Sequence, residues 1–277
     1  MLFADVECAA RIERAETDLA RDWCRATLVR RPELGVQTLD IAGGVACYAG
    51  PDAPLNKVIG LGFQGVPNDD ELAAVEALYR ERNCPSQIEV STLADPKVHA
   101  ALTQRGYTLR SFENILGLRP STACEVSPIP GIDIHLDDPS GLAQWLDTIV
   151  TGFISPDTQG AGGAEDFQRN ALEEIIRDMA SADGFRRYIA RRNGRLAAAG
   201  TMRIANGVAH MCGASTLPEH RRHGLQTCLV STRLADAKSE GAEIAVMTTQ
   251  PGSKSQQNAQ KQGFELLYAR AVLVKQD

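Results

Sequence analysis

The sequence predicts an α/β protein (α+β class) of two domains, and three observations support this prediction. Its 277 residues are enough for two ordinary domains, each with a core of its own. In the second half, strand-like runs alternate with runs that have helical spacing. Part of that order recurs in the first half at a nearly constant offset.

The second half begins with two helical segments and a hairpin. Residues 138–152 and 166–180 have the apolar spacing of helices. Residues 185–190 and 195–204 flank an Asn-Gly turn and therefore predict an antiparallel hairpin. A further strand is expected over residues 207–217, and it leads into a basic loop.

This loop carries the clearest functional signal. Residues 218–227 read Pro-Glu-His-Arg-Arg-His-Gly-Leu-Gln-Thr, and an amphipathic helix begins at their end. The free N–H groups of the first helical turn and the positive end of the helix dipole attract anionic oxygens. Glycine lets the backbone approach those oxygens closely. We therefore expect a pyrophosphate-binding loop here.

The spacing within the loop narrows the choice of ligand. A Walker loop, Gly-x-x-x-x-Gly-Lys-Ser/Thr, is absent, and no Gly-x-Gly-x-x-Gly follows a strand. Leu217-x-x-x-Arg221-x-x-Gly224-Leu225 instead resembles the acyl-CoA loop of the GNAT acetyltransferases, with the pattern Arg/Gln-x-x-Gly-x-Gly/Ala. Gln226 departs from that pattern, because the family usually has Gly or Ala there.

The elements after the loop extend the resemblance. The predicted helix ends near Lys238 and Gly241, and its apolar face consists of Leu225, Cys228, Leu229, Thr232 and Ala235. A strand over residues 242–249, a short helix that ends at Gly263 and a strand over 264–275 follow. This order resembles the second half of a GNAT domain, and the likeness covers about residues 131–275.

The resemblance implies acetyl-CoA as co-substrate and N-acetyl transfer to an amine as the activity. Backbone N–H groups of the loop would bind pyrophosphate, Arg221 or Arg222 would add charge, and Asn258 would bind the pantetheine arm. The predicted cofactor-binding residues are Ser215, Thr216, Leu217, Arg221, Arg222, His223, Gly224, Leu225, Gln226, Thr227 and Asn258.

Two side chains are candidates for acid–base catalysis. His210 lies on the strand before the loop and has a suitable intrinsic pKa for a base; a packed histidine and the alternative base Glu219 remain open. Strict alternation places His210 and Ser215 on opposite faces of that strand. Many family members carry a Tyr as acid where this chain has Ala259, so this role is unfilled or has moved. Tyr268 is a candidate for it, with a tyrosine packed in the core as the alternative. A backbone N–H near Ser215 to Leu217 could bind the oxyanion.

The first half echoes the second. The interval from Pro67 to Pro218 is 151 residues and that from Gly106 to Gly263 is 157, so the first copy lacks six residues between these anchors. The gap falls at the loop, where residues 68–71 read Asn-Asp-Asp-Glu and would repel phosphate. The resemblance thus implies two GNAT-like domains, each a mixed, mostly antiparallel sheet flanked by helices. Residues 1–122 would form a degenerate copy and residues 131–277 the acetyltransferase.

Composition limits the partners. A net charge of −6 argues against nucleic acid or an anionic membrane as the main partner. Seven scattered cysteines without a Cys-x-x-Cys pair suggest reduced thiols, and no metal is expected. Charged residues within the first eleven positions argue against a signal peptide, so we expect a cytoplasmic monomer or homodimer.

Three points stay open at this stage. The Gly-rich segment 155–163 is either a lid over the acceptor site or a plain connection. The amine acceptor, whether a small molecule or a peptide, carries no recognisable motif. A non-catalytic acyl-CoA sensor or scaffold and an unrelated α/β protein are the alternatives to an enzyme.

Overall fold

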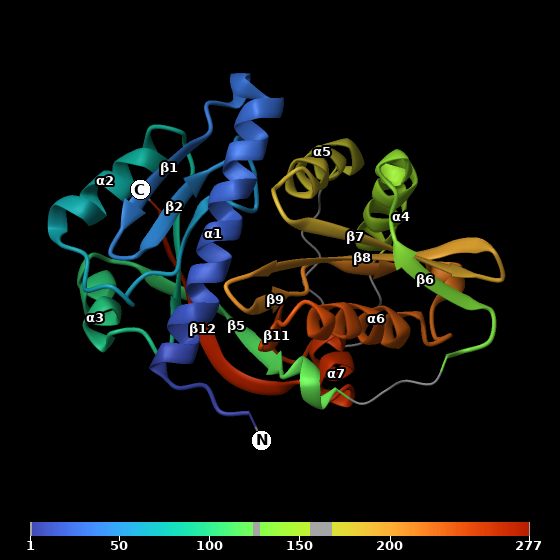
Figure 1. Ribbon diagram of the computed structural model, residues 1–277. Helices are drawn as coiled ribbons and strands as arrows, with labels where there is room; N and C mark the ends of the chain where they lie inside the picture. Colours follow the sequence, from blue (N-terminus) through green and yellow to red (C-terminus); the bar gives the residue numbers. More distant parts are fainter. Residues whose placement is uncertain (1, 124–127, 156–167, 277) are drawn as a thin grey trace. The chain divides into compact units, whose positions relative to one another are not determined.

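The computed structural model describes residues 2–123, 128–155 and 168–276 (Figure 1). Its contacts divide the chain into two compact units. The C-terminal unit comprises residues 1–2, 116–180 and 184–266, and the N-terminal unit comprises residues 3–115, 181–183 and 267–277. The predicted domain ranges differ from these units at the end of the chain. No helix in the described part is long and apolar enough to cross a membrane.

The C-terminal unit is built on a mixed sheet with the strand order β11-β9-β8-β7-β6. Its strands are β6 (Ile132–Leu136), β7 (Phe185–Arg192), β8 (Arg195–Ala205), β9 (Val208–His210), β10 (Ala214–Thr216) and β11 (Ile244–Thr249). β6 to β9 pair antiparallel, whereas β11 runs parallel to β9. β10 lies off this path and pairs with β8. The predicted hairpin is β7–β8.

Helices cover both faces of this sheet, with α4 and α5 on one face and α6 and α7 on the other (Figure 1). Their bounds are α4 (Leu142–Ile154), α5 (Arg169–Ala180), α6 (Leu225–Ser239) and α7 (Lys254–Lys261). Trp145 of α4 packs with Ala199 of β8. Leu229 of α6 packs with Ala198, the next residue of β8. Alternate residues of one strand therefore enter two different cores.

The buried face of α6 differs from the predicted one. The buried residues are Leu225, Leu229, Val230, Arg233, Leu234 and Ala237. Ala235, which the apolar pattern placed on the buried face, is exposed. Val230, Leu234 and Ala237 are apolar and form the buried stripe with Leu225 and Leu229, and the charged Arg233 lies within it. The predicted face chose Cys228, Thr232 and Ala235 instead and was therefore rotated about the helix axis.

The N-terminal unit has the strand order β1-β2-β3-β4-β12-β5. Its strands are β1 (Gln37–Ile41), β2 (Gly44–Tyr48), β3 (Lys57–Ile59), β4 (Ser86–Ser91), β5 (Thr108–Leu118) and β12 (Glu265–Lys275). The division between the units falls within β5 and within β12. Residues 270–275 of β12 pair antiparallel with residues 86–91 of β4. The end of the chain thus supplies an inner strand of this sheet.

Three helices cover the N-terminal sheet: α1 (Val6–Arg30), α2 (Asp69–Arg80) and α3 (Pro96–Gln104). Cys47 of β2 packs with Cys24 of α1. Ala46, its neighbour on β2, packs instead in the cluster that contains Leu72 of α2 and Val98 of α3. α1 therefore covers one face and α2 and α3 the other. The described residues also contain four short 3-10 helices: η1 (Pro32–Leu34) in this unit, and η2 (Pro120–Thr122), η3 (Pro139–Gly141) and η4 (Pro218–His220) in the C-terminal unit.

Charged side chains are buried between α1 and the N-terminal sheet, and we call them the buried ion cluster: Glu13, Glu16, Lys57, Glu89, Glu113 and Arg270. Arg270 is 0% exposed and its Nε lies 2.8 Å from Glu13 Oε1. It also contacts Glu16 and, at 3.6 Å, Glu113. Burial, together with the neighbouring Glu89 carboxylate, raises the pKa of Glu113 to about 7. Glu113 therefore titrates near neutral pH and is only partly ionised there.

Candidate functional site

The predicted phosphate-binding loop connects β10 to α6 through the short 3-10 helix η4 (Pro218–His220). Arg222 and Gly224 both adopt left-handed backbone conformations, with φ of 65° and 82°. Glycine tolerates this region without cost, whereas an arginine rarely enters it. The resulting turn leaves the side chains of Arg222 and His223 exposed to solvent.

The first turn of α6 is left without a side-chain cap. Gly224 occupies the N-cap position and has no side chain to donate or accept. The first main-chain bond of the helix joins Cys228 N to Gly224 O at 3.0 Å. Leu225, Gln226 and Thr227 precede it, and their N–H groups donate to no other described residue. These open N–H groups, at the positive end of the dipole, form a site for an anion.

Helix α2 of the N-terminal unit, which the sequence echo pairs with α6, has side-chain caps at its N-terminus. Asn68 Oδ1 accepts from Glu71 N at 2.9 Å, and Glu71 Oε2 accepts from Asn68 N at 2.8 Å. This reciprocal pair is a capping box. Asp69 and Asp70 add negative charge to the same turn. At α2 an anion would meet the already bonded N–H groups of Asn68 and Glu71 and the repulsive carboxylates, whereas at α6 it would meet open donors.

Arg221 is used to hold the loop. Its Nε donates to the carbonyl oxygen of Thr216 at 3.3 Å, and its Nη2 donates to the carbonyl oxygen of Ser155. Ser155 is the C-cap of α4. Arg221 therefore ties the start of the loop to the end of α4, while Arg222 remains exposed and able to meet an anion.

The strand before the loop parts from β11. Met211 N donates to Val246 O at 3.0 Å, at the end of the parallel pairing of β9 with β11. β10 then continues along β8, while β11 extends to Thr249. Leu217 N donates to Ala197 O on β8 at 2.9 Å, so alternation turns the N–H of Thr216 to the opposite edge. That edge is the one from which β11 has departed.

A bulge separates β9 from β10, and because of it the side chains of His210 and Ser215 do not lie on opposite faces as predicted. His210 is opposite Arg203 of β8, and Ser215 is opposite Ala199. Because residues 199 and 203 of one strand share a face, His210 and Ser215 share a face too, contrary to strict alternation. One extra residue in the stretch 211–213 shifts the register. The single predicted strand over residues 207–217 is thus two strands joined by this bulge.

Ser215 and His210 lie on the face that α4 covers. Ser215 Oγ donates to Thr148 O of α4 at 3.0 Å, and a Cβ at Gly152 of α4 would collide with Ser215. His210 is 7% exposed and lies between Arg203 on β8 and Val246 on β11. The alternative base Glu219 is exposed on η4.

The remaining predicted residues lie on α7 and β12. Asn258 is half-buried on α7, beside the buried Ala259. Tyr268 lies in the N-terminal unit, where its hydroxyl donates to Glu13 Oε1 at 2.8 Å. Burial and the Glu13 carboxylate raise the pKa of Tyr268 well above its usual value. Within the Gly-rich segment 155–163, residues 156–163 fall outside the described residues.

Two residues at the bulge were not among the predicted site residues. Thr201 Oγ1 donates to the carbonyl oxygens of Cys212 and Gly213, the latter at 3.2 Å. Arg233 Nη1 donates to the carbonyl oxygen of Thr201 at 2.9 Å. A sequence signal existed for Arg233, because it lies one helical turn after the core residue Leu229.

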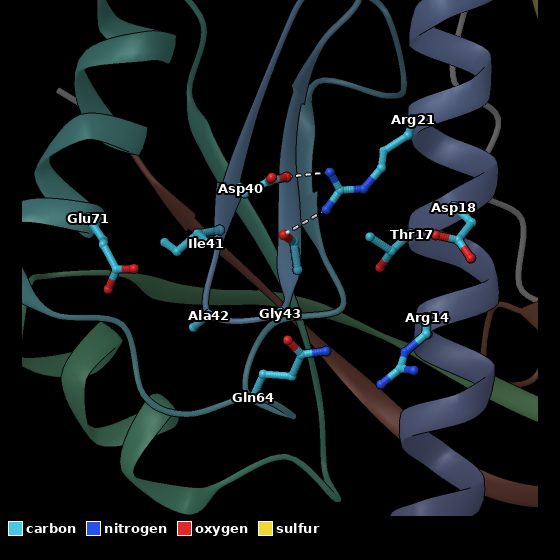
Figure 2. A pocket seen from close by; sticks show the side chains of 11 residues that line it. Arg14, Thr17, Asp18, Arg21, Asp40, Ile41, Ala42, Gly43, Gln64 and Glu71 are labelled. Carbon is cyan, nitrogen blue, oxygen red and sulfur yellow. Dashed lines mark hydrogen bonds and ion pairs between the residues drawn. The ribbon is translucent and has the colours of Figure 1, made fainter.

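A separate pocket of about 530 Å³ lies in the N-terminal unit, between α1 and the β1–β2 turn (Figure 2). Arg14 and Gln64 face it from opposite sides, and the ion pair of Arg21 with Asp40 lines one end. Its lining combines two arginines with three carboxylates, those of Asp18, Asp40 and Glu71. This balance gives a polyanion no advantage there, unlike the basic loop before α6.

Comparisons with known proteins agree with this geometry. Residues 129–249 match the family model described as the acetyltransferase (GNAT) domain. A GCN5-related N-acetyltransferase from Kribbella flavida aligns over 92% of this chain and 95% of its own, at 16% identity and a TM-score of 0.62. No curated protein matches the sequence.

A tandem GNAT protein from the clavulanic acid biosynthesis pathway aligns over 84% of this chain and 78% of its own, at 13% identity and a TM-score of 0.58. At such identities these structures establish the fold, and they confirm the predicted α/β class with a mixed sheet flanked by helices. Residues 129–249 are therefore similar to a GNAT acetyltransferase domain, and the chain shares the fold of these two structures.

Proposed function

We propose that the protein is an acetyl-CoA-dependent N-acetyltransferase whose active centre lies in the C-terminal unit. The observation that carries this proposal is the uncapped N-terminus of α6. Its open N–H groups follow a basic loop and stand next to the edge of β10 that β11 leaves free. A diphosphate attached to an extended arm fits these two features together, with the diphosphate at the helix and the arm along the strand edge.

The cofactor contacts divide among the predicted residues. The N–H groups of Leu225, Gln226 and Thr227, with Gly224 before them, receive the pyrophosphate, and Arg222 and His223 add positive charge. The N–H of Thr216 binds the pantetheine arm from the strand side, and Asn258 binds it from α7. Ser215, Leu217 and Arg221 act indirectly, since their polar groups already bond to Thr148, Ala197 and Ser155.

The reaction is direct acyl transfer. The nitrogen of an uncharged amine attacks the thioester carbonyl carbon, so that a C–N bond forms and the carbonyl oxygen becomes an oxyanion. The oxyanion collapses, the C–S bond breaks, and the products are an amide and the coenzyme A thiolate. The proton lost by the amine goes to a base, and the thiolate can leave without an acid because thiol pKa values lie near ~8.5.

His210 is our proposed base, because it lies on the strand that ends at the bulge. His210→Gln should lower kcat by about 10²-fold or more, as expected for loss of a general base, with little change in coenzyme A affinity. Glu219→Gln provides the comparison. A larger loss of kcat in Glu219→Gln than in His210→Gln would transfer the role to Glu219. Tyr268 is a weaker candidate for the acid, since its hydroxyl already donates to Glu13.

The N-terminal unit is proposed to be a degenerate copy without a coenzyme A site. The capping box of Asn68 and Glu71 and the acidic first turn of α2 support this, because the Glu71 N–H is already bonded and the carboxylates of Asp69 and Asp70 repel phosphate. Charge reversal at Asp69 and Asp70 should then leave coenzyme A affinity unchanged. Tighter binding in that variant would place a cofactor site at α2.

Calorimetry with the full-length protein tests the cofactor. We expect coenzyme A to bind and pantetheine, which lacks the pyrophosphate, to bind at least about 10-fold more weakly. Equal affinity for the two ligands would remove the loop from the cofactor site. Release of thiol from acetyl-CoA in the presence of a panel of amines then tests turnover.

A non-catalytic acyl-CoA sensor or scaffold is the second candidate. One observation favours it: α7 carries the buried Ala259 where many family members have a tyrosine. Tight binding of acetyl-CoA without thiol release across the amine panel would support this candidate. Thiol release with any amine would exclude it.

A further inference from the structure

The bulge between β9 and β10 leaves one carbonyl of β8 without its strand partner. β8 has two residues between Gly200 and Arg203, and the facing chain has three between His210 and Ala214. Thr201 N still donates to Gly213 O at 3.0 Å. In a regular antiparallel pair, the carbonyl of Thr201 would accept an N–H in return.

Arg233 of α6 supplies the missing donor. Its Nη1 lies 2.9 Å from Thr201 O, and its Nε donates to Leu229 O at 3.1 Å. Both partners are main-chain carbonyl oxygens, and the side chain is only 1% exposed. Burying a guanidinium costs free energy unless its N–H groups are hydrogen-bonded. The bond from Arg233 to Thr201 O therefore supplies a donor that the facing strand does not provide. Burial lowers the pKa of Arg233 to about 10, and the side chain is still a cation at neutral pH.

Thr201 fixes the direction of the bulge peptide. Its hydroxyl donates to Cys212 O, and the described chain contains no cis peptide. In a planar trans peptide, the C=O and the following N–H point in opposite directions. The N–H of Gly213 therefore points away from β8, toward the edge that β11 leaves. This N–H donates to no other described residue, and Gly213 is only half-buried.

We propose that Thr201 and Arg233 are positioning residues for acyl transfer, which hold the Gly213 N–H where it donates to the thioester carbonyl oxygen of bound acetyl-CoA. This inference rests on the proposed function. The hydrogen bond from the Gly213 N–H becomes stronger as the carbonyl oxygen becomes an oxyanion. It therefore stabilises the transition state more than bound acetyl-CoA and lowers the barrier to acyl transfer. Neither Thr201 nor Arg233 touches the substrate. They keep the bulge from relaxing into a regular pair, which would turn this N–H into the sheet.

The test measures the carbonyl of bound acetyl-CoA directly. Isotope-edited infrared spectroscopy of ¹³C-carbonyl acetyl-CoA on the full-length protein should show a lower stretching frequency than in water. Thr201→Val and Arg233→Met should return the band to higher frequency, while the affinity for coenzyme A stays within about twofold of wild type. Thr201→Ser, which keeps the hydroxyl, should preserve the shift. Thr27→Val removes an equally buried hydroxyl in the N-terminal unit and should change nothing.

The outcomes distinguish a failure of the positioning role from a failure of the proposed acetyltransferase function. If wild type binds no acetyl-CoA, the proposed function and this inference both fall. If wild type binds and Thr201→Val keeps the same carbonyl frequency, the positioning role alone is overturned. The Thr201 variants decide the matter even if Arg233→Met does not fold, because they change no charge.

Discussion

Arg221 donates from Nη2 to the main-chain carbonyl of Ser155, and this bond fastens the proposed phosphate-binding loop to the end of α4. Its Nε also donates to Thr216 O. Arg221→Met keeps an aliphatic stem and removes both bonds. We expect the free energy of unfolding to fall by about 1–3 kcal/mol, the usual worth of bonds from a charged donor. Affinity for coenzyme A should fall by about 10-fold, because the loop loses its support.

Arg222→Met is the matched control for this variant. Arg222 is exposed, so its loss should change the free energy of unfolding by less than about 0.5 kcal/mol. Its effect on coenzyme A affinity should shrink at high salt, as a screened charge contact does. Denaturant unfolding and calorimetry at two salt concentrations measure both quantities. Unchanged stability in Arg221→Met would show that the fastening is not needed.

Gly224 combines a left-handed backbone with a close neighbour. Its φ is 82°, and a Cβ there would collide with Cδ1 of Ile129. Gly241, at the other end of α6, has φ of 74° and no atom near such a Cβ. Gly224→Ala should therefore destabilise the protein by up to about 1 kcal/mol more than Gly241→Ala, because the terminal methyl of the half-buried Ile129 must move in addition to the shared backbone cost. Thermal unfolding of the two variants measures the difference; equal losses would contradict the collision.

Gly224→Glu adds charge at the same position. A carboxylate beside the open N–H groups would compete with pyrophosphate and repel it, so coenzyme A binding should be lost. Calorimetry measures the loss. Coenzyme A affinity equal to that of wild type in Gly224→Glu would place the diphosphate elsewhere.

Glu113 makes the stability of the N-terminal unit depend on pH. Its pKa is raised from 4.5 to about 7 in the folded protein, so the folded state holds a proton that the unfolded state releases. Stability from this group is full below about pH 4.5 and is lost as pH rises to about 7. Glu113→Gln removes this dependence. The variant should exceed wild type by about 1–3 kcal/mol at pH 8 and approach it near pH 4.5.

Denaturant unfolding at these two pH values checks the prediction, with the exposed Glu33→Gln as control. The groups around Glu113 are Glu16, Lys57, Glu89 and Arg270. A constant difference between Glu113→Gln and wild type at both pH values would show that Glu113 does not titrate in this range.

Removal of residues 267–277 should unfold the N-terminal unit. Those residues carry Arg270, the buried partner of Glu13, and Leu273 of the unit's core. Their loss leaves the buried carboxylate of Glu13 without its partner and removes the strand that lies between β4 and β5. Hydrogen exchange should show loss of protection in peptides that cover residues 86–91. Protection equal to that of the full chain would mean that the unit is complete without its last strand.

Local patterns predicted the elements around the loop well. The Asn-Gly turn, the basic loop and Gly241 each specify a conformation through neighbours in sequence, and the hairpin, the loop and the end of α6 were found where expected. The buried face of α6 was predicted wrongly, because small residues such as Thr232 and Ala235 also recur at helical spacing and compete with Val230 and Leu234 for the same stripe. The bulge could not be predicted from the sequence. The predicted faces assume that side chains alternate regularly along the strand, whereas a bulge is defined by how the strand pairs with its neighbour.

Contacts between segments that are far apart in the sequence could not be predicted from such local patterns. No element was predicted for residues 6–30, although α1 covers a whole face of the N-terminal sheet. Its buried Glu13 has a partner, Arg270, near the other end of the chain. Likewise, nothing local to residues 267–275 indicates that they pair with β4. Such contacts depend on the assembled fold and leave no periodicity behind.

The position of β12 also bears on how the chain is made. The ribosome synthesises β12 after every other described strand, so the gap beside β4 stays open until residues 270–275 have been made. During that time the newly made N-terminal segment exposes unpaired strand edges, a state that favours chaperone binding or aggregation.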